Sequence, residues 1–274
     1  MLCRGRRRRK AQLSSRGLHE RFPLAIEAIK MGPQRGTSTV GHFPFLNIDL
    51  GELPDEAEEL HSLAHLANIA CGGHAGDPGS MRRALLACRQ AGTRASAHPS
   101  YPDRPNFGRR SMSLSPGILK EELQRQLRAL ASVADALGVA VEAVKPHGAL
   151  YHDADRQQEL AKVVVDAAVE ALGEGVAIIA PPGGAFAAET SRASVRHLRE
   201  GFADRGLLAD GGLIPRGQLG DLILDPLLAA AQARALALSG RYDTLCVHGD
   251  TAGSVEVARA VRLALDRVAV EAWP

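Results

Sequence analysis

Long apolar runs are absent from this sequence. The 274 residues contain no uncharged stretch of about 20 apolar residues, which a membrane-spanning helix requires. We therefore expect no membrane partner. Cysteine is also scarce: the four cysteines lie far apart and form no C-x-x-C pair. This excludes a zinc ribbon and gives no sign of a disulfide-stapled secreted module, so we expect a globular cytoplasmic protein.

Three common enzyme signatures are missing as well. The sequence contains no G-x-x-x-x-G-K-[ST] phosphate loop, no G-x-G-x-x-G after the first predicted strand and no G-x-S-x-G nucleophile elbow. If the protein uses ATP, it does not bind it through a Walker motif.

Charge is distributed unevenly along the chain. Residues 1–43 carry ten Lys and Arg against two Asp and Glu, whereas the whole chain has a formal net charge of +2. Residues 44–274 therefore have a net charge of −6, which argues against a nucleic-acid-binding body. We predict a basic, disordered extension over residues 1–42 and one folded domain over residues 43–274. The basic run Arg6–Lys10 is also compatible with binding to nucleic acid or to an anionic membrane.

From Phe43 onward, short apolar runs alternate with amphipathic stretches. The predicted strands are Pro44–Leu50, Asn68–Cys71, Arg94–His98, Ala140–Lys145, Gly175–Ala180, Ser194–Glu200 and Thr244–His248. The predicted helices are Asp55–Leu66, Pro78–Ala91, Pro116–Leu137, Arg156–Leu172, Gly184–Arg192, Pro226–Ser239 and Ser254–Arg267. Strands that alternate with helices predict parallel α/β structure. About seven such units favour a single closed (β/α) barrel over an open doubly wound sheet, which is the alternative fold.

Polar and reactive residues follow nearly every predicted strand. They include Asp49 and Glu52 after the first strand, His74 after the second, His98 after the third, Lys145 and His147 after the fourth, Asp204 and Arg205 after the sixth, and His248 and Asp250 after the seventh. Because the carboxyl ends of parallel strands share one face, these side chains are expected to converge on one pocket there.

Each of these residues also has a structural interpretation. A histidine at a strand end can cap the strand or lie buried with satisfied hydrogen bonds, and Asp77 is expected to cap the helix that follows it. Lys145 is harder to explain in this way, because an unpaired buried ammonium is costly. We therefore expect a carboxylate partner for Lys145, such as Asp49 or Glu52, or an anionic ligand.

Two histidines stand apart from the strand ends. His61 and His65 are spaced i and i+4 on a predicted helix, a spacing that also suits a metal ion. The Glu of H-E-x-x-H does not accompany them, so we expect an exposed helix face.

Several stretches of the body carry motifs of a known family. They are Leu46–Glu52 (LNIDLGE), Asn68–Pro78 (NIACGGHAGDP), His98–Asp103 (HPSYPD), Phe107–Arg110 (FGRR), Lys145–Tyr151 (KPHGALY), Phe202–Arg205 (FADR), Leu213–Arg216 (LIPR) and Cys246–Asp250 (CVHGD). In these motifs and in their order, the chain resembles the LamB/YcsF family over nearly the whole body. The family is associated with the A subunit of the bacterial ATP-dependent 5-oxoprolinase. The resemblance implies a seven-stranded (β/α) barrel related to polysaccharide deacetylases.

The resemblance also implies an activity. It implies a hydrolase that cleaves the lactam of 5-oxo-L-proline to L-glutamate while ATP becomes ADP and phosphate, in a complex with subunits B and C. The residues expected to be catalytic are Asp49, His74, His98, Lys145, His147 and His248. The residues expected to bind substrate are Glu52, Arg109, Asp204, Arg205, Arg216 and Asp250.

The chemistry of lactam opening suggests roles within this set. The groups expected around phosphate are Lys145, Arg205 and Arg216. A histidine or Asp49 is expected to act as general base, and Arg109 or Arg110 to bind the substrate carboxylate.

Two other functions remain open on the sequence alone. One is a metal-dependent, deacetylase-like hydrolase in which Asp49, His74 and His98 bind a divalent ion. The other is a divergent, non-catalytic subunit of the complex.

The chain departs from the family pattern beside the first strand. Phe45 and Ile48 replace the usual Asp and Cys, and the stretch after Glu52 is shortened to Leu53–Glu56. Gly73 stands where Phe is common.

Overall fold

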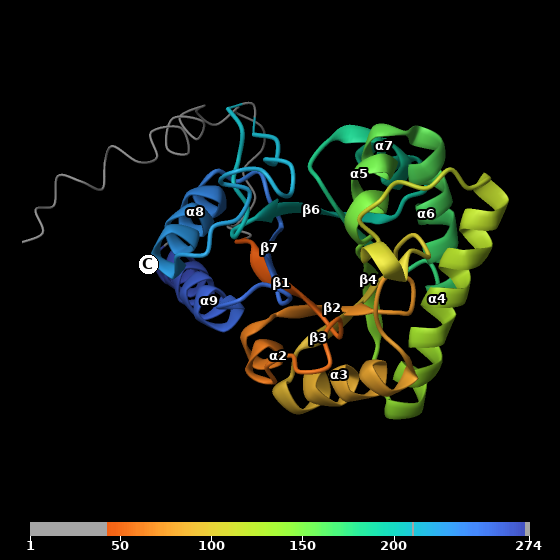
Figure 1. The fold of residues 1–274 in the computed structure, drawn as a ribbon, viewed down its shortest axis with the longest axis horizontal. Helices are drawn as coiled ribbons and strands as arrows, with labels where there is room; N and C mark the ends of the chain where they lie inside the picture. Colours follow the sequence, from red (N-terminus) through yellow and green to blue (C-terminus); the bar gives the residue numbers. More distant parts are fainter. Residues whose placement is uncertain (1–42, 210, 272–274) are drawn as a thin grey trace, which may run out of the picture.

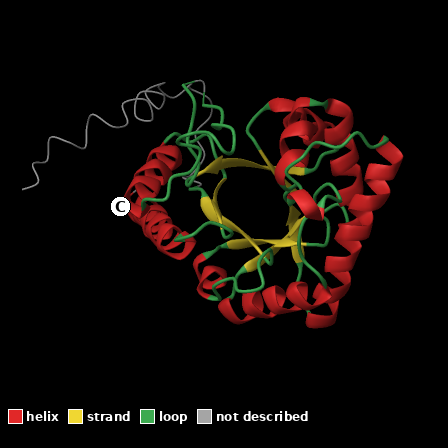
Figure 2. Cartoon of the chain, in the orientation of Figure 1, coloured by secondary structure: helices red, strands yellow, loops and turns green. Residues whose placement is uncertain are grey.

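Parallel strands close into a barrel. The computed structural model describes residues 43–209 and 211–271, and within them seven strands follow one another around the ring in chain order (Figure 1; Figure 2). They are β1 (Phe45–Leu50), β2 (Leu66–Ala70), β3 (Arg94–His98), β4 (Val141–Val144), β5 (Ala177–Ala180), β6 (Arg196–Phe202) and β7 (Thr244–His248). Because β7 pairs back with β1, the ring is closed. The predicted single (β/α) barrel is confirmed, and the open doubly wound sheet is wrong.

Helices surround the barrel on its outer side (Figure 2). They are α2 (Glu59–Leu63), α3 (Pro78–Ala91), α4 (Pro116–Leu137), α5 (Gly148–Arg156), α6 (Gln158–Leu172), α7 (Gly184–Arg192), α8 (Pro226–Leu238) and α9 (Ser254–Glu271), with a short 3₁₀ turn, η2 (Arg104–Asn106). All strand pairings are parallel, so the carboxyl ends of the strands lie at one rim of the barrel.

Side-chain caps define the starts of three helices. Asp77 Oδ1 accepts the backbone N–H of Ser80 at 2.9 Å, which confirms Asp77 as the N-cap of α3. Ser115 caps α4 and Asp225 caps α8 in the same way, and each cap is followed by proline. Proline suits this position because its missing N–H has no partner in the first turn of a helix.

The first predicted helix is too long. The sequence pattern places it over Asp55–Leu66, but α2 ends at Leu63, because Leu66 already pairs with β1 as the first residue of β2. His65 therefore lies outside the helix, where its Nδ1 accepts the N–H of Leu46 at 3.1 Å. His61 is only 6% exposed. The expectation of an exposed helix face for these two histidines is wrong, since strand pairing overrides the helical pattern.

Two further boundaries differ from the prediction. The segment predicted as one helix over Arg156–Leu172 is preceded by a separate helix, α5, which begins at Gly148 without a capping side chain and so lacks an N-terminal signal. Strand β6 runs to Phe202 instead of ending at Glu200, because it pairs with β7 over its last residues.

Apolar side chains fill the space between the strands and the helices. In β1, Leu46, Ile48 and Leu50 are fully buried, and the stripe of leucines on α4 that begins at Leu119 is buried from Leu119 to Leu130. No helix in the described part of the chain is long and apolar enough to cross a bilayer. The predicted N-terminal extension, residues 1–42, lies outside the described residues, as do residues 272–274.

A pair of neighbouring residues on α4 tests the packing of this layer. Leu119 is fully buried, whereas the adjacent Ile118 is 58% exposed. Leu119→Ala is expected to lower the free energy of unfolding by about 2–5 kcal/mol, because it leaves a cavity beneath the helix. Ile118→Ala is expected to change it by no more than about 0.5 kcal/mol. Urea unfolding measures both, and equal losses would contradict this packing.

Candidate active site

Polar side chains from most of the strands meet inside the rim formed by the strand carboxyl ends. The buried ones are Asn47 and Asp49 of β1, Asn68 of β2, His98 of β3, Lys145 after β4, Glu200 of β6 and Cys246 of β7. Five strands and the segment after β4 thus supply one cluster, as parallel strands around a closed ring allow.

Lys145 lies at the centre of this cluster and is 2% exposed. Its Nζ is 2.8 Å from Asp49 Oδ1 and 3.0 Å from Glu200 Oε1. It also lies 3.0 Å from Cys246 Sγ and 3.3 Å from Asn47 Oδ1. Burial disfavours the charged ammonium, but the Asp49 and Glu200 carboxylates more than offset this and hold the pKa of Lys145 well above its usual value. The carboxylate partner expected for Lys145 is therefore present, and it is Asp49 rather than Glu52.

Asp49 connects Lys145 to two histidines. Its Oδ1 accepts a hydrogen bond from Asn68 Nδ2 at 2.8 Å, and its Oδ2 lies 3.4 Å from His98 Nε2 and 3.9 Å from His248 Nε2. Burial raises the pKa of a carboxyl, yet His98 and Lys145 together hold the pKa of Asp49 well below its usual value. Asp49 is therefore an anion at neutral pH.

A second cluster adjoins the first and contains Glu52, His74 and His147 beside His98. His74 Nε2 lies 2.8 Å from Glu52 Oε1, and the rings of His74 and His147 stack with centroids 3.6 Å apart. Burial and the nearby His147 lower the pKa of His74 to about 3, so its ring is neutral at pH 7. Gly108 makes this packing possible, because a Cβ there would lie only 2.9 Å from His74 Cβ.

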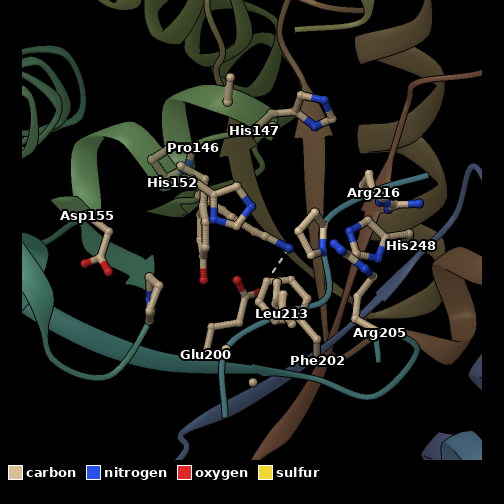
Figure 3. Close-up of a pocket in the computed structure, with 18 of the residues that line it drawn as sticks. Pro146, His147, His152, Asp155, Glu200, Phe202, Arg205, Leu213, Arg216 and His248 are labelled. Carbon is tan, nitrogen blue, oxygen red and sulfur yellow. Dashed lines mark ion pairs between the residues drawn. The ribbon is translucent and has the colours of Figure 1, made fainter. Parts of the chain in front are cut away.

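His248 is oriented by an acidic residue behind it. Asp204 Oδ2 accepts the backbone N–H of His248 at 2.8 Å and faces its Nδ1 at 2.9 Å. A carboxylate only accepts hydrogen bonds, so the imidazole proton lies on Nδ1 and the Nε2 lone pair faces Asp49 and the pocket. Figure 3 shows the His248 ring at the pocket wall.

A cavity of about 740 Å³ opens above the Lys145 cluster. Its floor includes Asp49, His98 and Lys145, and its walls carry arginines from different loops (Figure 3). Three of these arginines belong to the predicted set, namely Arg109, Arg205 and Arg216.

The three arginines differ in the groups that hold their side chains. Arg205 donates to the backbone carbonyls of Asp221 and Ile214 at 2.9 and 2.7 Å, so it braces the loop that carries Arg216. Arg109 pairs with Asp250 across the rim. Arg216 is exposed and, within the described residues, has no carboxylate at ion-pair distance.

The structure thus brings the predicted residues to one rim, in three groups. Asp49, Lys145, His248 and Asp204 form one; Glu52, His74, His98 and His147 form another; Arg109 with Asp250, Arg205 and Arg216 stand around the opening. The sequence does not single out Glu200, Asn47 or Asn68 as site residues. The only available signal is for Glu200, which is the last residue of its predicted strand and in the structure lies within β6, facing Lys145.

Two groups of side chains have the composition of a metal site. In the described residues they are Glu52, His74, His98 and His147, and separately Asp49, Cys246 and His248. The predicted metal set of Asp49, His74 and His98 is therefore divided between the two groups. The reason is that Asp49 is held by Lys145, whereas Glu52 faces the histidines.

The departures from the family pattern leave this geometry in place. Phe45 is at the amino-terminal end of β1, four residues and so about 13 Å before Asp49. In the shortened loop, Glu56 Oε2 accepts the N–H of Gly51 at 2.8 Å and so fixes the backbone next to Glu52. A Cβ added to Gly73 would lie 2.5 Å from Gln126 Oε1. The buried Gln126 therefore fills the space that a larger residue at position 73 would need.

The fold and the site define a seven-stranded (β/α) barrel with a buried carboxylate, lysine and histidine cluster beneath a pocket rimmed by arginine. A sequence model of the LamB/YcsF family matches residues 45–274. The chain belongs to the LamB/YcsF family.

Known proteins of similar sequence and structure agree with this. A protein of Nocardia farcinica, named as the A subunit of 5-oxoprolinase, is 42% identical over 248 residues, which cover 83% of this chain and 98% of that protein. A protein of the same name from Thermus thermophilus is 38% identical over 243 residues, covering 82% and 97%. The crystal structure of the lactam utilization protein from Thermus thermophilus aligns with a TM-score of 0.76 at 36% identity, covering 83% of this chain and 97% of that one.

Removing the buried ammonium tests the charge balance of the site. Lys145→Met is expected to lower the free energy of unfolding by about 3–5 kcal/mol, because Asp49 and Glu200 would remain buried without their cation. The control is Lys162→Met on α6, whose side chain is 52% exposed and pairs with Asp166. We expect it to cost less than about 1 kcal/mol. Chemical denaturation measures both, and similar losses would show that the buried cation is not needed.

Proposed function

We propose that this chain is the A subunit of an ATP-dependent 5-oxoprolinase, which hydrolyses the lactam of 5-oxo-L-proline to L-glutamate. The names of its relatives and the lactam utilization protein of similar fold support this. The observation that carries the proposal is the pocket itself. It joins an oriented histidine, a buried acid–lysine centre and a rim of guanidinium groups around a space suited to a small anion.

The reaction sets the requirements for such a pocket. A lactam is a poor electrophile, because resonance between the nitrogen and the carbonyl stabilises it. Phosphorylation of the amide oxygen by ATP activates the carbonyl carbon for attack by water. In the overall reaction the ring C–N bond breaks, the carbon gains a hydroxyl, the nitrogen gains a proton, and ATP and a second water become ADP and phosphate.

His248 is the general base for the attacking water in this proposal. Asp204 holds the proton of the ring on Nδ1, so Nε2 can accept a proton from a water in the pocket. A base that is oriented by a carboxylate behind it is a recurring arrangement in hydrolases. Asp49, 3.9 Å from Nε2, stabilises the imidazolium that forms.

The anionic parts of the substrates are bound at the rim. Arg216 is exposed beside the opening, and its planar fork matches a carboxylate or a phosphate in a bidentate way. Arg205 positions the Arg216 loop through two backbone carbonyls and adds positive charge to the same wall. Arg109, expected to bind the substrate carboxylate, lines the pocket and is paired with Asp250, so it also ties two rim loops together.

ATP is the proposed co-substrate, and subunits B and C are the proposed partners. The relatives are each named as one lettered subunit of an enzyme, which supports an assembly with further subunits. The sequence has no Walker motif, so ATP activation requires either a different kind of phosphate site on this chain or a site on a partner.

Glutamate release by the assembled complex tests the activity and the base together. We expect release from 5-oxo-L-proline only when ATP and the partner subunits are present. In His248→Gln, we expect kcat to fall by about 100- to 10,000-fold, the usual contribution of a positioned general base. His197→Gln is the matched control, because His197 lies on β6 away from the pocket.

The outcomes of this assay separate the candidate functions. ATP-independent hydrolysis of acetylated sugars would favour the deacetylase-like hydrolase. Unchanged turnover in His248→Gln would favour a non-catalytic subunit, with the chemistry on a partner.

The role of Arg216 is tested by the effect of its removal on the KM values. Arg216→Ala is expected to raise the KM for 5-oxo-L-proline or for ATP by about 10- to 100-fold, the value of one or two charge-assisted hydrogen bonds. The control Arg234→Ala removes an exposed arginine of α8 that pairs with Glu271. If both variants keep the parental KM values, Arg216 does not bind either substrate.

A further inference from the structure

Four potential ligand atoms converge beside the Lys145 cluster. Glu52 and the histidines His74, His98 and His147 each contribute one atom, and these atoms all lie within 4.8 Å of one another. All four side chains are buried, with exposures of 0–5%. For two of the three rings, a hydrogen bond on the far side determines which nitrogen faces inward with a lone pair.

Two of the histidines have their protons fixed by the backbone. His98 Nδ1 lies 2.7 Å from the carbonyl oxygen of Lys145, and His147 Nε2 lies 2.9 Å from that of Phe107. A carbonyl oxygen only accepts, so each ring donates its N–H there. A neutral imidazole has one N–H, so the other nitrogen of each ring bears a lone pair.

These lone pairs point at each other. His98 Nε2 and His147 Nδ1 are 3.0 Å apart, and neither has a proton to share in the neutral form. Glu52 Oε1, also an acceptor, lies 3.3 Å from His147 Nδ1 and 3.7 Å from His98 Nε2. Acceptors packed this closely repel one another unless a cation lies between them.

The charge of Glu52 leads to the same requirement. Its side chain is 2% exposed, and no Lys or Arg in the described part of the chain pairs with it. His74, its nearest partner at 2.8 Å, has a buried Nδ1 without a hydrogen-bond partner. A buried carboxylate that no Lys or Arg neutralises is costly, and a bound cation removes that cost.

The neighbouring group of Asp49, Cys246 and His248 already contains its cation. Lys145 Nζ lies 2.8 Å from Asp49 Oδ1 and 3.0 Å from Cys246 Sγ. The ammonium neutralises this group and would repel a second cation placed within it. A metal ion is therefore expected at the Glu52 group.

We propose that Glu52, His74, His98 and His147 bind one divalent transition-metal ion of the zinc type. Three imidazoles and one carboxylate suit Zn²⁺ or Co²⁺, whereas Mg²⁺ and Ca²⁺ prefer oxygen ligands. The four ligand atoms lie within 4.8 Å of one another, which is close enough for all of them to approach one ion.

The surroundings of the ligands support the same assignment. Ligating histidines commonly donate their second N–H to a backbone carbonyl, which fixes both the tautomer and the ring direction, and His98 and His147 do so here. These two histidines also line the pocket, whereas Glu52 and His74 are not among its lining residues. The ion therefore lies in the pocket wall, whichever reaction the pocket performs.

Metal content and metal binding test the proposal without any assay of activity. Untagged protein is stripped with a chelator, and Zn²⁺ binding is then measured by competition calorimetry and Co²⁺ binding by visible absorption. We expect one Zn²⁺ per chain, visible bands from bound Co²⁺, a rise in unfolding temperature with Zn²⁺, and no comparable effect of Mg²⁺. His74→Ala is expected to weaken Zn²⁺ binding more than about 100-fold, because losing a direct ligand costs more than losing an outer partner.

A control variant and two results that would overturn the proposal complete this test. His197→Ala, on β6 outside the group, is expected to bind Zn²⁺ as the parental chain does. If folded parental protein binds neither Zn²⁺ nor Co²⁺ in a one-to-one ratio, a shared proton on His98 supplies the cation and the proposal is wrong. Binding that is equally strong in His74→Ala would also overturn it. Neither result depends on whether the protein opens a lactam.

Discussion

The Lys145 ammonium lies inside the barrel, 2.8 Å from Asp49 and 3.0 Å from Glu200, with 2% of the residue exposed. These residues come from β1, β6 and the segment after β4, so the charges can balance only if the ring of strands is closed in register. The buried ion pairs stabilise the fold weakly at best, since desolvation offsets much of their attraction, but each charge makes the others necessary. Because of this mutual dependence, the floor of the pocket consists of one ammonium group surrounded by carboxylates.

The rest of the site is arranged around that floor. Asp49 faces His98 on one side and His248 on the other, so it links the Glu52–histidine group to the Asp204–His248 pair. One group holds its cation as a lysine side chain, whereas the other has acceptors and, within the described residues, no paired Lys or Arg. A single rim thus offers a positive centre, an oriented base and a set of ligand atoms, with guanidinium groups above them.

The sequence predicts the barrel because the alternation of strands and helices, the proline caps and the polar strand ends all indicate the same topology. Helices α3 and α4 begin and end where the pattern places them, because their caps are local. Helix α5 is not predicted, because Gly148 gives no capping signal. The predicted end of β6 lies two residues too early, because the actual end is set by pairing with β7. The Arg109–Asp250 pair joins loops 141 residues apart, so sequence spacing cannot predict it. Spacing also cannot show that Asp49 and Glu52 belong to different groups of the site, because that depends on the directions of their side chains.

A double-mutant cycle between Lys145 and Asp49 tests most directly whether the buried charges depend on one another. The free energies of unfolding are measured for Lys145→Met, Asp49→Asn and the double variant, with chain concentration and salt held constant. The two changes are expected to be coupled by about 1–3 kcal/mol, with the double variant more stable than the sum of the single losses predicts. Additivity to within about 0.5 kcal/mol would contradict the account, because it would mean that the ammonium and the carboxylate do not balance each other.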